Sequence, residues 1–67
     1  MKNTVHVQRA IHHMNQTELA QAIGVSRQTI SSIEKNRYVP STVLALKMSR
    51  LFKVPVEDIF ILEESDE

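Results

Sequence analysis

Apolar residues recur along the chain at spacings of three and four, the periodicity of short amphipathic helices. Five such segments are expected, at residues 5–13, 16–23, 27–35, 42–52 and 55–59. Their inward-facing side chains are expected to be Leu19, Ala20, Ile23, Val25, Ile30, Ile33, Leu44, Ala45, Met48, Leu51 and Phe52. The pattern therefore predicts an all-α domain of five helices.

The sequence does not decide the secondary structure of the two ends of the chain. Residues 60–62 form an apolar run that suits either a helix or a strand. Residues 2–4 could pair with this run as a second strand. A small two-stranded antiparallel sheet from residues 2–4 and 60–63 therefore remains as an addition to the helices.

Residues that favour helix ends stand between the apolar segments. Asn15 and Glu18 have the spacing of a capping box, and Ser26 can cap the next segment. Gly24, the single glycine, ends the second segment where a left-handed backbone is needed. Asn36 is expected to end the third, because asparagine tolerates that backbone conformation. Two short helices joined by this tight turn form the helix-turn-helix pattern.

The outer face of the third segment is polar. Ile30 and Ile33 are expected to face the core. Because successive residues of a helix are rotated by about 100°, the positions of these two isoleucines show which other side chains face outward. Gln28, Ser31, Ser32 and Lys35 point away from the core, with Arg27 at the edge of that face. Small hydrogen-bonding side chains on a helix can enter a major groove and reach base edges. An ordinary solvated helix face is the alternative.

Composition limits the chain to one small domain. It has 67 residues, 42% of them hydrophobic, and no cysteine. A domain of this size is marginally stable alone, and the lack of cysteine excludes disulfides and thiolate metal sites. A second copy of the chain is then the leading source of extra stability.

No apolar run approaches the roughly 20 residues of a membrane span, and the N-terminus lacks a signal-peptide pattern. We expect a cytoplasmic protein that contacts no membrane.

Charge is distributed unevenly although the net charge is +0. Residues 1–53 hold eight basic and two acidic side chains (8 − 2 = +6), and residues 54–67 hold six acidic and no basic ones (−6). This polarity indicates a basic working surface and an acidic tail at residues 63–67. The alternative is a solvated surface with a disordered acidic end.

Neither catalysis nor metal binding is expected. The chain has no Gly-rich phosphate loop and no set of nucleophile, histidine and carboxylate with room for a cleft. His6, His12 and His13 share the first segment, but adjacent residues diverge by about 100° and the outer pair spans about 10 Å of helix axis. Neither spacing suits one ion. We therefore expect no enzyme activity, no metal and no cofactor.

The motifs together resemble the Cro/CI-type (XRE-like) helix-turn-helix regulators, and above all their minimal single-domain bacterial members. The resemblance covers roughly residues 5–60. It is carried by Gln16-Thr17-Glu18-Leu19-Ala20, Gly24-Val25-Ser26-Arg27-Gln28-Thr29-Ile30-Ser31, Ile33-Glu34-Lys35-Asn36-Arg37, Pro40-Ser41, Ala45-Leu46-Lys47 and Val56-Glu57-Asp58-Ile59-Phe60. It implies a single DNA-binding domain over residues 1–67 with the five-helix, lambda-repressor-like fold and its helix-turn-helix at about 16–35.

The resemblance also implies roles for individual residues in binding double-stranded DNA through its major groove. Contacts to bases are expected from Arg27, Gln28, Thr29, Ser31 and Ser32. Contacts to phosphates are expected from Gln16, Thr17, Ser26, Lys35, Asn36 and Arg37. Arg9 and Glu34 match a pair that forms a partly buried salt bridge, so Glu34 is assigned a structural role.

Some positions depart from the family pattern. His13 and Lys53 stand where a helix-ending glycine is common, and His12 stands where relatives often have a large aliphatic residue. Val7 and Ile11 lie at the spacing of an exposed apolar pair. The first helix is therefore expected to pack less well than in relatives.

The expected function is that of a sequence-specific transcriptional regulator. A repressor that binds a palindromic operator as a homodimer is favoured. An antitoxin with the same DNA-binding part is one alternative, and a protein-interaction module with a vestigial helix-turn-helix is another. Apolar residues in the C-terminal third exceed what one short helix can bury, so a dimer interface is expected there; the alternative is that residues 60–62 pack as a strand on their own chain. The expected dimer interface consists of Val43, Val56, Ile59, Phe60, Ile61 and Leu62.

Overall fold

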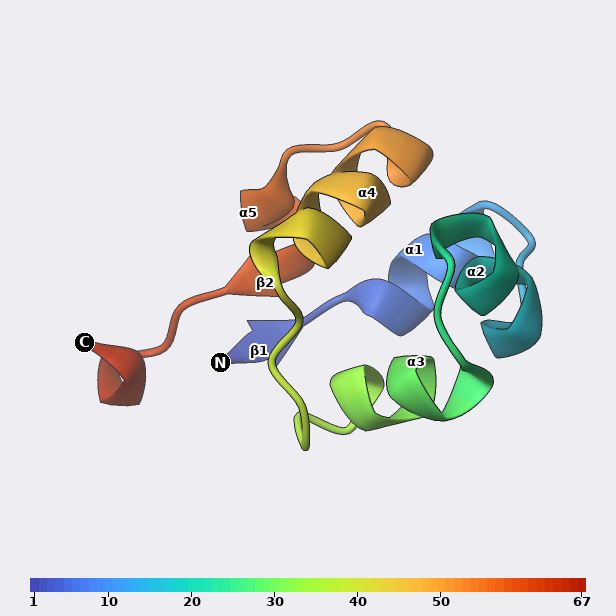
Figure 1. Cartoon of the computed structure of the whole chain (residues 1–67). Coiled ribbons are helices and arrows are strands. Elements are labelled where there is room, and N and C mark those ends of the chain that lie inside the picture. The colour runs from blue at the N-terminus through green and yellow to red at the C-terminus, as the bar shows by residue number, and fades with distance from the viewer.

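The computed structural model describes residues 1–67 and contains five helices and one two-stranded sheet (Figure 1). The helices are α1 (Val5–Ile11), α2 (Gln16–Ile23), α3 (Arg27–Glu34), α4 (Thr42–Phe52) and α5 (Val56–Ile59). Strands β1 (Lys2–Asn3) and β2 (Phe60–Ile61) come from the two chain ends, and a short 3-10 helix, η1, covers Glu64–Asp66. The predicted five-helix fold is therefore confirmed, together with the small sheet that the sequence left open.

The core lies where the helices meet. It contains nine buried side chains, all of them hydrophobic. They are Val5, Leu19, Ala20, Ile23, Ile30, Ile33, Met48, Phe52 and Ile59. Every helix contributes at least one of them, so the recognition segment α3 is fixed by side chains from the whole domain.

Local capping sets the boundaries of α2 and α3. The Asn15 side chain accepts a hydrogen bond from the Glu18 N–H, and the Glu18 carboxylate accepts one from the Asn15 N–H. Ser26 accepts from the Thr29 N–H in the same way at the start of α3. Gly24 has a φ of 78°, the left-handed conformation that glycine adopts without steric cost. These ends place α2 and α3 as the two helices of a helix-turn-helix.

Three residues other than glycine also have a positive φ. These are His13 (55°), Asn36 (59°) and Lys53 (58°). His13 and Lys53 are the positions where the sequence lacks an expected glycine, and the backbone takes the left-handed conformation there nevertheless. The first helix ends at Ile11 rather than at residue 13, because the chain turns at His13 toward the cap of α2.

The sheet joins the two ends of the chain. Lys2 pairs with Ile61 and Asn3 with Phe60 in antiparallel register. The Thr4 N–H donates to the Ile59 carbonyl oxygen at 2.8 Å, which extends the pairing to the end of α5. Beyond β2 the acidic segment 62–67 projects from the body of the domain (Figure 1).

The prediction that Ile59 belongs to a dimer interface is wrong. Ile59 has a relative exposure of 0% because it points from α5 into the core of its own chain. The apolar run from residue 59 to 62 has no internal period that tells which side chain faces inward. Its first residue is therefore a core residue and not a surface contact.

Candidate nucleic-acid interface

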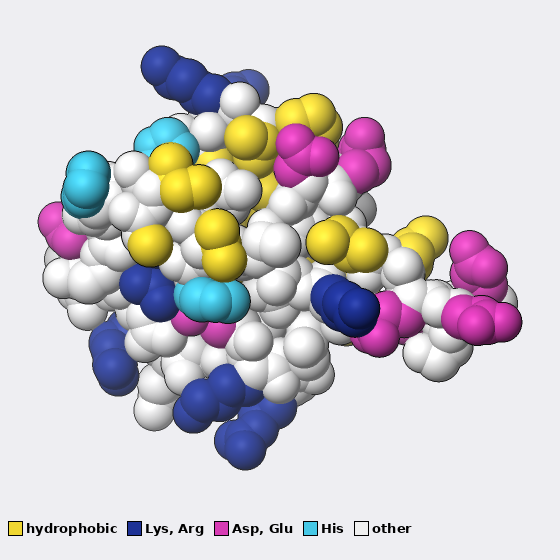
Figure 2. All heavy atoms as spheres, turned by 180° about the vertical axis from the view of Figure 1, so that it is seen from behind, with side chains coloured by type: hydrophobic (Ala, Val, Ile, Leu, Met, Phe, Trp, Pro, Cys, Tyr) yellow, Lys and Arg dark blue, Asp and Glu magenta, His cyan; other side chains and the backbone are white.

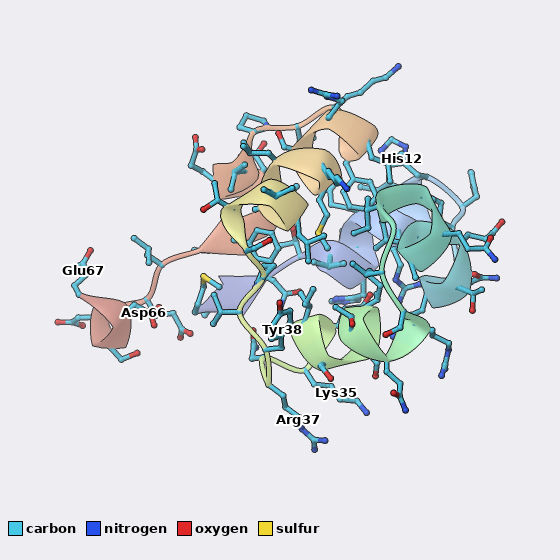
Figure 3. All side chains as sticks on the ribbon, in the orientation of Figure 1. His12, Lys35, Arg37, Tyr38, Asp66 and Glu67 are labelled. Carbon is cyan, nitrogen blue, oxygen red and sulfur yellow. The ribbon has the colours of Figure 1, made fainter.

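The outer face of α3 is exposed and polar. Arg27, Gln28 and Lys35 are exposed, and Ser31 and Ser32 are half-buried on the same helix. In Figure 3 the side chains of Lys35 and Arg37 point away from the body of the domain on the α3 side. The face from which the sequence predicts base contacts is thus accessible to a large ligand.

A shallow polar depression runs beside this face. It is lined by Ser26, Gln28, Thr29, Ser32, Arg37 and Tyr38. The first four come from the start and outer face of α3, and the last two follow the helix. The structure therefore gathers residues assigned to bases and to phosphates around one hollow. The sequence favours packing of Tyr38 at the loop over stacking on a base, and its side chain is half exposed at 45%.

Two residues expected to contact DNA also have structural roles. The Ser26 hydroxyl accepts the Thr29 N–H at 3.2 Å and lies 3.0 Å from the Thr29 hydroxyl. This cap fixes the N-terminal turn of α3 and leaves its first residue, Arg27, exposed. The two hydroxyls are hydrogen-bonded to each other before any DNA is bound.

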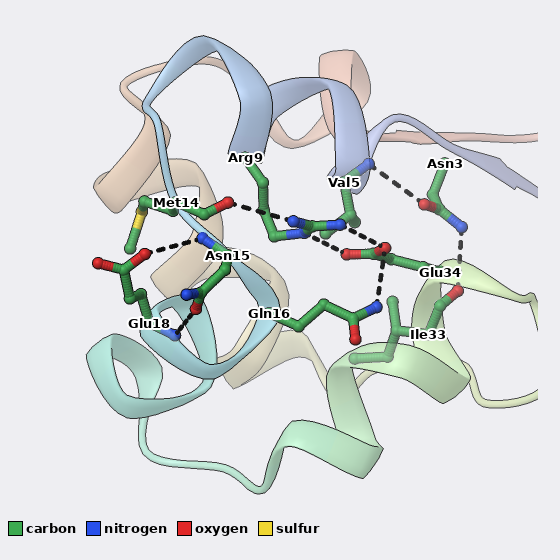
Figure 4. Close-up of polar contacts among 9 residues, drawn as sticks. All are labelled: Asn3, Val5, Arg9, Met14, Asn15, Gln16, Glu18, Ile33 and Glu34. Atoms are coloured by element: carbon green, nitrogen blue, oxygen red, sulfur yellow. Dashed lines mark hydrogen bonds and ion pairs between the residues drawn. The ribbon is translucent and has the colours of Figure 1, made fainter.

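Behind α3, Arg9 and Glu34 form a bidentate ion pair (Figure 4). Arg9 Nε donates to Glu34 Oε2 at 2.6 Å, and Arg9 Nη2 donates to Glu34 Oε1 at 3.0 Å. A third guanidinium donor, Nη1, bonds the Met14 carbonyl oxygen at 3.1 Å. This is the pair that the resemblance implied, and it connects α1 to the end of α3.

Gln16 belongs to the same network. Its side-chain amide donates to Glu34 Oε1 at 3.2 Å, so it points toward the ion pair (Figure 4). The sequence could not show this contact, because Gln16 and Glu34 lie on different helices. A phosphate contact from Gln16 would use its second amide hydrogen or the N-terminus of α2.

The network shifts the ionisation of both charged partners. Burial by itself raises the pKa of Glu34, but the hydrogen bonds from Arg9 and Gln16 outweigh burial and hold this pKa below its ordinary value. The hydrogen bonds that Arg9 donates to Glu34 raise the pKa of Arg9. The only carboxylate on α3 is therefore ionised and neutralised by Arg9, so the outer face keeps a positive character.

The turn after α3 is anchored through its backbone. The Asn36 N–H donates to the Ile33 carbonyl oxygen at 3.0 Å, and the Arg37 N–H donates to that of Ser32 at 2.9 Å. Asn3 adds side-chain hydrogen bonds to this turn from the sheet. Sequence reasoning missed Asn3, because its contacts join residues that lie 30 and 33 positions apart.

Acidic side chains are concentrated on the C-terminal segment. Figure 2 shows them on this projecting segment and a few others elsewhere, while several basic side chains lie along the lower edge of the same view. Glu63 and Asp66 contact the Met1 amino group at 2.9 and 3.0 Å, which holds η1 close to β1. The acidic end of the sequence therefore also forms an acidic region on the surface of the protein.

A second surface is apolar. Val43 and Leu62 are exposed at 61% and 67%, Ile61 at 40%, and Val56 and Phe60 are half-buried. A groove beside them is lined by Met1, Val39, Pro40, Thr42, Ala45, Leu46, Val56 and Phe60. Sequence reasoning missed Leu46, which is 57% exposed on α4. Phe60 and Ile61 pair with β1 of their own chain and offer a partner only their outer sides.

His12, which ends α1, lies apart from this chemistry. His12 Nε2 lies 3.2 Å from the Phe52 carbonyl oxygen at the end of α4, and its ring stacks at 5.3 Å on the Phe52 ring. No group of three or more histidine and carboxylate side chains is arranged to hold a metal ion. None of the helices is long and apolar enough to span a membrane.

Comparison with known proteins agrees with this geometry. Residues 8–59 match the family model described as "Helix-turn-helix". An uncharacterized HTH-type transcriptional regulator of Methanocaldococcus jannaschii is 50% identical over 66 residues, which cover 98% of this chain and 100% of that protein. The uncharacterized HTH-type transcriptional regulator YgzD of Bacillus subtilis is 47% identical, again over 98% of this chain and 100% of its own length.

A third relative is the ImmF control region 10 kDa protein of Bacillus phage phi105. It is 37% identical over 51 residues, which cover 76% of this chain and 57% of that protein. None of these names supports the antitoxin alternative. With the α2–α3 geometry and a family match over most of its length, the chain belongs to the Cro/CI-type (XRE-like) helix-turn-helix family of DNA-binding transcriptional regulators.

Proposed function

We propose that the protein is a sequence-specific repressor that binds a palindromic operator as a homodimer, on the nucleoid in the cytoplasm. The observation that carries this proposal is the outer face of α3. It is exposed, rich in hydrogen-bonding groups and free of uncompensated acid, because Glu34 is paired with Arg9. A helix with such a face can be inserted into the major groove.

Base reading is assigned to the outer face of α3. The Arg27 guanidinium suits the two acceptors of guanine, and the Gln28 amide suits the donor and acceptor of adenine. Ser31 and Ser32 are short enough to let the helix approach base edges, and Thr29 can contact a thymine methyl group. The fixed cap at Ser26 supports this assignment, since it holds Arg27 and Gln28 in the first turn of a rigid helix.

Phosphate contacts are assigned to both sides of this face. Thr17 and Gln16 lie at the N-terminus of α2, where backbone N–H groups favour an anion. Lys35, Asn36 and Arg37 follow α3 and are all exposed. Such contacts fix the register of the protein on the duplex and carry no sequence information themselves.

Dimerisation is assigned to the apolar groove and its neighbours. Val43, Leu46 and Leu62 are large apolar side chains left in contact with water by the single chain. Two copies related by a two-fold axis would present two α3 helices, which can read two half-sites one DNA turn (roughly 34 Å) apart.

Repression is favoured over activation by one relative. The phage phi105 protein is named for a control region, and binding there is the simplest way to exclude polymerase from a promoter. A pure protein-interaction module is disfavoured, because its contact helix would expose large apolar anchors. The α3 face instead exposes Arg27, Gln28 and Lys35.

Selection of binding sites from random DNA tests the proposal. The expected product is an inverted repeat whose half-sites are centred about 10 base pairs apart. Sedimentation at micromolar concentration should show a dimer that dissociates when Leu62 or Leu46 is changed to Glu. A selected site without two-fold symmetry, or a monomer in the unaltered protein, would contradict the homodimer. A transcription assay on the selected promoter then separates repression from activation.

A further inference from the structure

Both the nitrogen and the oxygen of the Asn3 side-chain amide form hydrogen bonds, and Figure 4 shows those to Val5 and Ile33. Its Nδ2 donates to the Ile33 carbonyl oxygen at 3.0 Å and to Asn36 Oδ1 at 2.9 Å. Its Oδ1 accepts from the Val5 N–H at 3.2 Å. Asn3 sits on β1 opposite Phe60, so it connects the sheet to the end of the recognition helix.

These three partners determine which way each amide is turned. The Val5 N–H can only donate and the Ile33 carbonyl can only accept, so the oxygen of Asn3 must face Val5 and its nitrogen must face Ile33. The same nitrogen faces Asn36. The atom of Asn36 that meets it must therefore be the oxygen, and the amide nitrogen of Asn36 is turned the other way.

The turned-out nitrogen is free to bind. Asn36 is exposed, and its Nδ2 makes no hydrogen bond within the chain. Its backbone is also held, with a φ of 59° and an N–H bonded to the Ile33 carbonyl oxygen. The amide nitrogen of Asn36 is therefore turned away from Asn3, on an exposed residue that directly precedes Arg37.

We propose that Asn3 is a positioning residue for DNA binding, which presents the amide hydrogens of Asn36, and not its oxygen, to a backbone phosphate. The inference rests on the proposed function, in which Asn36 contacts phosphate. Phosphate oxygens only accept hydrogen bonds, so an outward carbonyl oxygen would repel the group that an outward NH2 binds. The orientation of the Asn36 amide thus decides whether its contact with a phosphate is attractive or repulsive.

Asn3→Asp reverses this orientation. A carboxylate has the size of the amide and only accepts, so it can accept from the Val5 N–H as before, but only the NH2 of Asn36 can bind it. It also loses the hydrogen bond to the Ile33 carbonyl oxygen, a loss that is the same with and without the Asn36 side chain. The oxygen of Asn36 then faces DNA. An added negative charge could also repel DNA directly, so the effect must be measured with and without the Asn36 side chain.

The experiment is a double-mutant cycle on binding to a mixed-sequence DNA duplex, measured across salt concentrations. Asn36→Ala is expected to lower affinity about ten-fold and to reduce the log–log salt slope, as loss of one phosphate partner does. Asn3→Asp is expected to lower affinity at least as much. In the Asn36→Ala background it is expected to change affinity less than about two-fold, because nothing remains for it to turn.

The outcomes separate the inference from the proposed function. If Asn3→Asp weakens binding equally in both backgrounds, it acts through charge or folding, and the positioning role is overturned. If the unaltered protein does not bind duplex DNA, the proposed function fails instead. If Asn36→Ala binds as well as the unaltered protein, Asn36 contacts no phosphate, and the inference fails while Arg37 and Lys35 still support the function.

A second measurement does not depend on how stable the variants are. In the unaltered protein without DNA, the Asn36 NH2 protons should show only a weak nuclear Overhauser effect to the Asn3 NH2 protons, because the oxygen of Asn36 and not its nitrogen faces Asn3. A strong effect between the two NH2 groups in the unaltered protein would overturn the assigned orientation.

Discussion

Arg9 on α1 and Glu34 on α3 are joined by two hydrogen bonds of 2.6 and 3.0 Å, although 25 positions separate them in the chain. Both side chains are mostly buried, with exposures of 18% and 11%. A paired charge in such a place is tolerated, whereas an unpaired one is costly. The pair therefore couples the first helix to the recognition helix.

Removing one partner of this pair should be more damaging than removing both. We expect Arg9→Ala and Glu34→Ala each to lower the free energy of unfolding by about 2–4 kcal/mol, because each strands a partly buried charge. The double variant should lose less than the sum of the two, with a coupling of about 1–3 kcal/mol. Urea unfolding of the four proteins measures this cycle. Additive losses would mean that the two charges do not stabilise each other.

Stability should fall in acid through Glu34. Its pKa is lower in the folded chain than the value of about 4.3 in an unfolded one. The stabilisation is therefore complete above about pH 5 and is lost as the pH falls through the folded pKa. Glu34→Gln should flatten the dependence of the free energy of unfolding on pH below about 5.

Asp66 needs a separate control in that experiment. A hydrogen bond from the Glu63 backbone N–H, together with the Met1 amino group, lowers its pKa as well. Asp66→Asn removes this second titration while leaving the α1–α3 pair intact. A slope that Asp66→Asn abolishes and Glu34→Gln leaves unchanged would assign the acid sensitivity to the tail.

Loss of a base contact and loss of a phosphate contact should affect DNA binding differently. Arg27→Ala and Gln28→Ala should each weaken binding to the selected operator by about 1–3 kcal/mol and relax sequence choice at one base pair. Arg37→Ala should weaken operator and unrelated DNA alike and lower the salt slope by about 0.9. Fluorescence anisotropy with operator and scrambled duplexes distinguishes the two classes. Unchanged discrimination in both α3 variants would show that α3 does not read the bases as assigned.

Glycine should be favourable at Lys53 and necessary at Gly24. Lys53 ends α4 with a φ of 58°, so Lys53→Gly should raise the free energy of unfolding by about 0.5–1 kcal/mol. Lys53→Ala removes the same charge but keeps the Cβ, and should give no such gain. Gly24→Ala should cost about 1–2 kcal/mol through backbone conformation alone, because a Cβ there meets no atom within 4 Å. Thermal unfolding monitored by circular dichroism gives all three values.

Features set by neighbours in sequence could be predicted. The capping residues Asn15, Ser26 and Ser41 each accept from an N–H three positions ahead, so their spacing was visible in the chain. Periodicity likewise identified Ile30 and Ile33 as inward residues of α3, and both are buried. The helix-turn-helix follows from these local signals.

Features set by distant residues could not be predicted in the same way. The pairing of Asn3 with Phe60 joins two strands of two residues each, too short for a clear alternating pattern. The four residues of α5 did not reveal that Ile59 faces inward. The bond between Gln16 and Glu34 appears only once α2 and α3 are packed together. The assigned DNA contacts themselves remain predictions.

The first helix is held by few contacts, and this affects its motion. Val5 is the only fully buried side chain of α1, whereas Val7 and Ile11 are 42% and 61% exposed. Regions with little buried apolar surface open locally at a lower free energy than the whole domain. We therefore expect the backbone amides of α1 to exchange with solvent deuterium before those of α3 and α4. Each such opening separates Arg9 from Glu34 and briefly leaves an unpaired negative charge behind the recognition helix.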